Sequence, residues 1–311
     1  MKIILKCIRW LIPYMLSPYG LVMLYWQLKK IPKMIKIRNY FLNLNYNEQE
    51  LEIIEIIDYF RKYELPLKHK ILSPCFLVFP YEFTRKYNST DIDVFYDKSN
   101  KTRYLMHENK RLYFPNKWDV EQIQAYYNGL SVEQDKDSPH RYDTEEFSVK
   151  AGDIIADIGA AEGIWALSNI EKASKVYLFE RGPIWINALQ KTFEPWKDKV
   201  VIVNKYVSDI SDKKNVTLDG FFNGQDVNHI KVDVEGMELK VLEGSKEILK
   251  KNAGMKLLFC TYHQENDAVQ IQGILEKNGF TTEYSKGYML FIHDDNLREP
   301  YIRRGLIRAK K

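Results

Sequence analysis

The sequence lacks the patterns that would point to a structural metal or to disulfide bonds. Its three cysteines, Cys7, Cys75 and Cys260, stand far apart with no C-x-x-C pair, and the six histidines do not cluster at metal-ligand spacing. Neither a disulfide framework nor a zinc site is therefore indicated, and the pattern favours a reducing compartment. The chain also lacks an internal repeat, a low-complexity tract and the G-x-G-x-x-G loop typical of dinucleotide-binding proteins.

Acidic residues are absent from residues 1–38, which hold eight of the 46 basic residues. The rest of the chain then has 38 basic and 42 acidic residues and is mildly acidic. Such a charge balance argues against a nucleic-acid-binding protein, and no N-P-P-Y-like or D-P-P-Y-like segment of nucleic-acid methylases occurs. We expect no nucleic-acid partner.

Residues 10–28 form an uncharged, aromatic stretch, "WLIPYMLSPYGLVMLYWQL", between basic flanks. Its length raises the question of a membrane span, but Pro13, Pro18 and Gly20 interrupt it. No small-x-small cleavage site of a signal peptide follows it. The stretch favours a segment in the membrane interface over an amphipathic helix packed on the protein or a true span. Residues 1–45 are accordingly predicted to be a membrane-associating segment.

Residues 46–148 are predicted to be a helical and mixed region. Apolar residues recur at helical spacing in 47–65, and "RYLMHENKRLYFP" is typical of a β-hairpin that turns near Asn109.

Short apolar runs alternate with helical stretches from residue 149 onward, which predicts a mostly parallel sheet covered by helices in a domain of residues 149–311. Only Lys286 and Gly287 separate "FTTEYS" from "YMLFIH", so these two segments are predicted to form a C-terminal antiparallel hairpin. The strands expected before this hairpin are 153–158, 175–180, 199–207, 229–234 and 256–262.

A strand-loop-helix unit at 153–180 is typical of a nucleotide-type cofactor site. Its loop includes Asp157, Gly159, Ala160 and Gly163, and Glu180 closes the second strand, where its carboxylate is placed to accept both hydroxyls of a ribose. An acid in the loop repels a pyrophosphate but suits a cationic ligand such as S-adenosylmethionine. The alternative is that the glycines serve close packing and that Glu180 is a solvated strand end.

The third predicted strand ends in "NKYVSD", residues 204–209. Ser208 and Asp209 are candidates to meet the exocyclic amine of an adenine, and an Asx-type turn is the competing interpretation.

The segment "HIKVDVEGMELKVLEG", residues 229–244, resembles the FkbM family of S-adenosylmethionine-dependent methyltransferases, whose signature is a strand followed by D-x-E-G-x-E and a helix. The likeness extends over residues 149–293 and includes "DIGAAEG" and "YLFE". It implies a Rossmann-like class I methyltransferase sheet and S-adenosylmethionine as the cofactor. "EQDKDSPHRY" and "YIRRGLIRAKK" are similar to members attached to bacterial surface-glycan pathways.

Methyl transfer to a sugar oxygen needs a group that takes the hydroxyl proton as the new bond forms. The candidates lie at the ends of the fourth and fifth predicted strands: Asp233, Glu235 and His263. Asp233 and Glu235 are two apart on an extended chain, so one of them raises the pKa of the other or the pair collects a divalent cation. His140 and Tyr142 are candidates to line the acceptor, with packing as the alternative.

The basic C-terminus is interpreted either as a solvated tail or as a contact for anionic lipid or a diphosphate-linked acceptor. Its residues are Arg303, Arg304, Arg308, Lys310 and Lys311.

The sequence and the resemblance together predict an O-methyltransferase for a sugar of a bacterial surface glycan or its lipid-linked precursor, peripheral on the cytoplasmic face of the membrane. A non-catalytic binding module in a membrane-associated glycan assembly and a nicotinamide-dependent enzyme are the alternatives.

Overall fold

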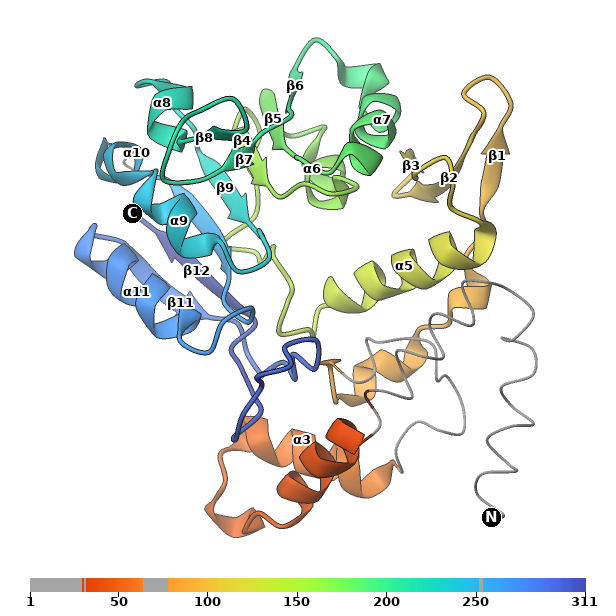
Figure 1. Cartoon of the computed structure of the whole chain (residues 1–311), viewed down its shortest axis with the longest axis vertical. Helices are drawn as coiled ribbons and strands as arrows, with labels where there is room; N and C mark the ends of the chain where they lie inside the picture. The colour runs from red at the N-terminus through yellow and green to blue at the C-terminus, as the bar shows by residue number, and fades with distance from the viewer. Residues whose placement is uncertain (1–29, 31, 64–77, 252–253) are drawn as a thin grey trace.

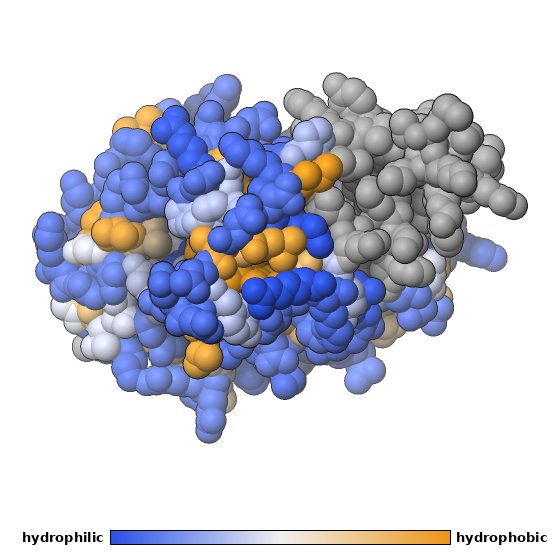
Figure 2. Space-filling view, turned by 90° about the horizontal axis from the view of Figure 1, so that it is seen from below, coloured by the Kyte–Doolittle hydropathy of each residue, from blue (hydrophilic) through white to orange (hydrophobic). Residues whose placement is uncertain are grey.

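The computed structural model describes residues 30, 32–63, 78–251 and 254–311 (Figure 1). The prediction for residues 10–28 lies outside them. Among the described residues, no helix has both the length and the apolar character that crossing a membrane requires. Seen from below, the described surface is largely hydrophilic, with small apolar patches (Figure 2).

A seven-stranded sheet forms the centre of the protein, in the order β11-β12-β10-β9-β4-β5-β6. Only β12 runs antiparallel to its neighbours β10 and β11 within this sheet. This topology is that of the Rossmann-like class I methyltransferase sheet, so the predicted fold class is confirmed. The strands are β4 (Ile154–Ile158), β5 (Lys175–Phe179), β6 (Val200–Val203), β9 (His229–Val232), β10 (Lys256–Cys260), β11 (Thr281–Tyr284) and β12 (Leu306–Lys310).

Strand order reverses between β4 and β9, which are neighbours although β5 and β6 lie between them in the chain. Ligands of open α/β sheets bind beyond the carboxyl ends of the strands at such a reversal. The fold therefore places the ends of β4 and β9 at the centre of a binding crevice.

Helices cover both faces of the sheet, and successive residues of each strand point to opposite faces. Ile155 belongs to one apolar cluster, shared with α6, α7 and the N-terminal part of the chain, whereas Ala156 belongs to the other, shared with α8 to α11. The helices are α6 (Ile164–Asn169), α7 (Pro183–Thr192), α8 (Leu218–Phe222), α9 (Glu238–Glu243), α10 (Lys246–Lys251) and α11 (Asp267–Lys277).

The predicted N-terminal helix is α3 (Leu51–Lys62), and the predicted hairpin is β2 (Thr102–His107) with β3 (Lys110–Tyr113). Glu108 and Asn109 make its two-residue turn with φ of 47° and 64°, as a type I′ turn requires. A third strand, β1 (Phe95–Asp97), pairs with β2. Helix α5 (Val120–Glu133) then begins at a capping box of Asp119 and Gln122 and runs toward the sheet (Figure 1).

Short elements complete the described chain. The third predicted strand, 199–207, divides after Val203, and Tyr206 and Val207 pair with β8 in a separate ladder. These elements are η2 (Tyr46–Glu48), η3 (Glu82–Lys86), η4 (Ser89–Asp91), η5 (Glu194–Trp196), β7 (Tyr206–Val207) and β8 (Asn215–Val216).

The antiparallel C-terminal pair is present, but its second strand differs from the prediction. β11 pairs with β12 at 306–310, not with "YMLFIH", which leaves the sheet. There Met289 makes an isolated bridge to Arg303, and the backbone N–H of Leu290 donates to Val78. The short spacing at Lys286 and Gly287 was misleading because both partners of a strand pair have to be adjacent in space, not in sequence.

The basic C-terminus is consequently not a solvated tail as a whole: Arg303 and Arg308 are buried, and only Lys310 and Lys311 at its end are exposed. Leu306 and Ile307 are fully buried in β12, between β10 and β11. Arg308 is 6% exposed and donates from Nε to the carbonyl oxygen of Tyr142 at 3.0 Å. Arg303 donates to the carbonyl oxygens of two residues that follow β10 and pairs with Asp294. These arginines hold the C-terminal segment against the sheet.

Candidate functional site

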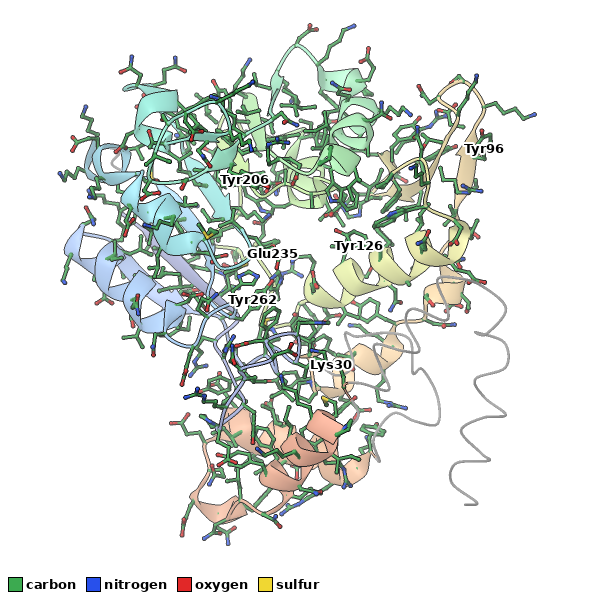
Figure 3. The ribbon with its side chains drawn as sticks, viewed as in Figure 1. Lys30, Tyr96, Tyr126, Tyr206, Glu235 and Tyr262 are labelled. Atoms are coloured by element: carbon green, nitrogen blue, oxygen red, sulfur yellow. The ribbon has the colours of Figure 1, made fainter. Side chains whose placement is uncertain are left out.

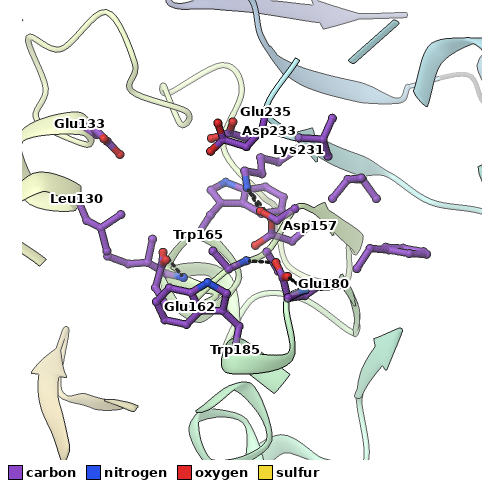
Figure 4. A pocket seen from close by; sticks show the side chains of 18 of the residues that line it. Leu130, Glu133, Asp157, Glu162, Trp165, Glu180, Trp185, Lys231, Asp233 and Glu235 are labelled. Atoms are coloured by element: carbon purple, nitrogen blue, oxygen red, sulfur yellow. Dashed lines mark hydrogen bonds and ion pairs between the residues drawn. The ribbon is translucent and has the colours of Figure 1, made fainter. Parts of the chain in front are cut away.

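A cavity of about 1180 Å³ opens at the carboxyl ends of β4, β5 and β9 and is faced by α5 from the other side (Figure 4). It lies at the reversal of strand order, where the topology predicts a ligand. Polar and aromatic side chains from both halves of the chain line it. The lining residues used below are Glu133, Tyr142, Asp157, Gly159, Ala160, Glu162, Glu180, Ser208, Lys231, Asp233, Glu235 and Tyr262.

Glu180 directly follows β5 and is half-buried at the cavity wall. Its Oε2 accepts a hydrogen bond from the backbone N–H of Ala161 at 2.9 Å, and its Oε1 accepts one from the backbone N–H of Gly182. Two backbone donors thus orient the carboxylate and leave it further lone pairs toward the cavity. The predicted placement at the strand end is observed, and the carboxylate fits the two hydroxyls of a ribose.

Gly159 directly follows β4 with φ of 76°, and a Cβ there would lie 1.9 Å from the backbone oxygen of Asp233. A glycine is therefore required for β4 and the end of β9 to approach each other. Ala160 lines the cavity and donates its N–H to the carbonyl of Phe179. Gly163 serves packing, because a Cβ there would lie 2.9 Å from the side chain of Leu189 in α7.

The sequence suggested that both Ser208 and Asp209 lie near the adenine. The structure places only Ser208 at the cavity. Ser208 lines the cavity, and its hydroxyl donates to Asp209 Oδ1 at 2.9 Å. Asp209 turns to Lys240, whose Nζ lies 3.1 Å from its Oδ2. Ser208 is thus the better placed of the two toward a ligand.

The sequence suggested that Asp157 lies in the turn after the first strand. In the structure it lies within β4. Its side chain is 1% exposed, and Oδ1 lies 2.9 Å from Nζ of Lys231 on β9. Lys231 also donates to the carbonyl oxygen of Gly159 at 2.8 Å. Burial lowers the pKa of Lys231, but the charges of Asp157 and Asp233 outweigh it and raise this pKa. The pair is a buried cross-link between β4 and β9.

Asp233 follows β9 and lies beside both residues predicted to line the acceptor, of which Tyr142 lines the cavity, whereas His140 is buried behind it and does not. Its Oδ2 accepts a hydrogen bond from the hydroxyl of Tyr142 at 2.8 Å and lies 3.8 Å from Nε2 of His140. Burial favours the neutral acid, but Lys231, His263 and His140 lower the pKa of Asp233 to about 2. Burial lowers the pKa of His140 to about 4. Asp233 is therefore an ionised carboxylate at the cavity wall.

His263 is 4% exposed, and its Nδ1 lies 2.9 Å from Oε1 of Glu238 at the start of α9. Burial opposes protonation, yet Glu238, Asp233 and Glu235 raise the pKa of His263 to about 9. At neutral pH the ring already holds its proton and cannot accept another. The structure therefore does not support His263 as a general base. In the sequence His263 was a lone histidine, but in the fold three carboxylates surround it and keep it protonated.

Glu235 stands in a turn with φ of 55°, not on an extended strand, and 87% of its side chain is exposed. Partial desolvation at the cavity and the charge of Asp233 raise the pKa of Glu235, and the charge of His263 opposes this effect. Two groups of described residues could hold a metal ion, His140–Asp233–Cys260 and Asp233–Glu238–His263, and neither includes Glu235. A cation between Asp233 and Glu235 stays a prediction.

Sequence reasoning missed Lys231, Glu133 and Tyr262. A lysine inside the apolar strand "HIKVDV" was a signal, since a buried lysine needs an acidic partner. Glu133 carried no such signal, because only the tertiary fold brings α5 to the sheet, and nothing in the sequence set Tyr262 apart from the chain's other tyrosines.

Comparison with known proteins agrees with this topology. The Methyltransferase FkbM domain matches residues 198–282. This segment is therefore similar to an FkbM methyltransferase domain. The family resemblance of the sequence is thereby confirmed, and the match includes β9 and its D-x-E-G-x-E segment. None of the curated proteins matches the chain.

Three solved structures are among those that match this chain. A methyltransferase FkbM from Methylobacillus flagellatus KT is 14% identical, with a TM-score of 0.40, over 61% of this chain and 54% of that one. An rRNA methylase from Streptococcus thermophilus is 16% identical, with a TM-score of 0.37, over 52% and 89%. Aeropyrum pernix fibrillarin in complex with natively bound S-adenosyl-L-methionine is 16% identical, with a TM-score of 0.34, over 52% and 67%. The chain spans about half the length of the first of these proteins, 54%.

Proposed function

We propose that the protein is an S-adenosylmethionine-dependent O-methyltransferase that methylates a sugar hydroxyl of a bacterial surface glycan or its lipid-linked precursor. The observation that carries the proposal is that one cavity holds both Glu180, oriented at the end of β5, and the ionised Asp233 at the end of β9. The first suits a ribose and the second suits a hydroxyl nucleophile.

Residues of the β4 loop and of β5 fit the cofactor. S-adenosylmethionine supplies a methyl group activated by the sulfonium when it is bound. Glu180 would accept hydrogen bonds from the ribose hydroxyls, and Gly159 would let the backbone come close to the ligand. Acidic side chains around this part of the cavity, including Glu162, favour a ligand with positive charge.

Asp233 would act on the acceptor. A hydroxyl oxygen gains positive charge as it attacks a methyl group, and its proton becomes more acidic. An ionised carboxylate facing that oxygen stabilises the charge and accepts the proton, and the hydroxyl of Tyr142 fixes its orientation. Protonated His263 stabilises the negative charge of Asp233 from 3.7 Å.

The glycan acceptor and the membrane location rest on the family resemblance and on the basic, aromatic residues 1–38. Flotation of the full chain with anionic liposomes, and its loss after deletion of residues 1–38, is the expected result for membrane attachment.

The cofactor assignment is tested by calorimetry with S-adenosylmethionine, S-adenosylhomocysteine and NAD. We expect micromolar binding of the first two only. Glu180→Ala should weaken S-adenosylmethionine binding by about 1.5 to 3 kcal/mol, the range for a hydrogen bond to a charged group. Glu194→Ala is the matched control, because Glu194 is exposed in η5. An unchanged affinity in the Glu180 variant would refute its role, and NAD binding would refute the proposed activity.

A further inference from the structure

Glu133 is the last residue of α5 and faces the end of β9 across the cavity (Figure 4). Opposite it stand Asp233 and Glu235. No hydrogen bond or ion pair of its carboxyl group occurs within the part of the chain that the structure describes. The side chain is half-buried and lines the cavity, so its carboxyl group is placed to bind a ligand.

Tyr262 provides an independent second observation from the opposite wall. It follows β10, is 8% exposed and lines the cavity (Figure 3). Its ring packs on His263 and Phe291, with centroid distances of 4.1 Å and 5.0 Å. Its hydroxyl has no hydrogen-bond partner among the described residues. Burial raises the pKa of Tyr262 well above its usual value, so the phenol stays a donor.

The charges around these two groups are predominantly negative. Burial raises the pKa of Glu133 to about 8, and the charges of Asp233, Glu162 and Glu235 act in the same direction. Lys231 opposes this effect, but its charge is already paired with Asp157. An anionic group placed here would meet the carboxyl groups of Asp233 and Glu235, and the nearby cations, Lys231 and protonated His263, are paired with Asp157 and Glu238.

We propose that Glu133 and Tyr262 form the acceptor subsite and that this subsite takes a hydroxyl-rich sugar unit without negative charge. A protonated carboxyl group and a phenol offer donors and acceptors to sugar hydroxyls, which themselves donate and accept. The carboxylates exclude uronic acids and sugar phosphates from the reacting position by repulsion. This inference rests on the proposed function and specifies its acceptor.

The test compares matched sugar pairs on protein saturated with S-adenosylhomocysteine. Ligand-observed NMR measures binding of methyl α-glucoside and methyl α-galactoside against the corresponding methyl glucuronide and galacturonide. We expect binding of the neutral members only. Preferred binding of the uronates, or no binding of any neutral glycoside while S-adenosylhomocysteine still binds, would overturn the subsite. Failure of S-adenosylhomocysteine itself to bind would instead overturn the proposed function.

Single substitutions test whether Glu133 and Tyr262 bind the glycoside. Glu133→Ala and Tyr262→Phe should each weaken binding of the neutral glycoside roughly three- to tenfold, as expected for one hydrogen bond. Glu121→Ala is the matched control because Glu121 is exposed in the first turn of the same helix. Unchanged affinity for S-adenosylhomocysteine shows that each variant is folded. Equal glycoside binding in all three variants would exclude Glu133 and Tyr262 as the subsite.

Discussion

The two walls of the cavity differ in how their charged groups are compensated. On the sheet side, Lys231 and Asp157 lie 2.9 Å apart, and His263 and Glu238 also lie 2.9 Å apart. On the side of α5, the carboxyl group of Glu133 has no partner among the described residues. Paired charges hold the strand ends in place, whereas the group without a partner is available to a ligand. The sheet side is therefore a rigid wall that also carries the proposed ligand contacts of Glu180, Asp233 and Tyr262, and the side of α5 adds Glu133.

The largest expected effect comes from breaking a pair on the rigid wall. Lys231→Met leaves Asp157 buried without a cation and should lower the free energy of unfolding by about 3 to 5 kcal/mol, measured by urea unfolding. The double variant with Asp157→Asn should recover much of this loss, because it removes the uncompensated charge. Equal loss in the single and the double variant would show that the ion pair is not the cause.

The second test concerns the protonation of His263. Its pKa is raised from 6.5 to about 9, so its stabilising contribution is fully present below pH 6.5 and is lost as the pH rises through 9. Urea unfolding between pH 6 and pH 10 should show this decline. Glu238→Gln removes the carboxylate bonded to the ring and should reduce the decline. An NMR titration that places the pKa of His263 below 6.5 would contradict the pairing.

The smallest effect is expected at the start of α5, far from the paired wall. Asp119 accepts a hydrogen bond from the backbone N–H of Gln122 at 2.8 Å in the capping box. Asp119→Ala should therefore lower the free energy of unfolding by about 1 kcal/mol in urea. Glu121→Ala in the same turn is the control. A loss as large as that of Lys231→Met would mean that both walls depend equally on their charges.

Local patterns in the sequence determined the parallel strands and the placement of Glu180. Apolar runs of strand length recur between helical stretches, and the observed strands β4, β5, β9 and β10 lie within the predicted ranges. Gly159 was also recognisable, because glycine tolerates the positive φ that a close turn requires. These features depend on neighbouring residues, so the sequence alone is sufficient to predict them.

Only the tertiary structure decided which segment completes the sheet and which charges meet. Residues 306–310 enter between β10 and β11 because their apolar side chains are buried there, although a nearer segment had the right pattern. The pKa of His263 depends on Glu238 and Asp233, which lie on other elements. The same holds for Glu133, which α5 brings to the end of β9. Strand pairing, burial and Coulomb interactions act between residues distant in sequence, so their outcome depends on the fold.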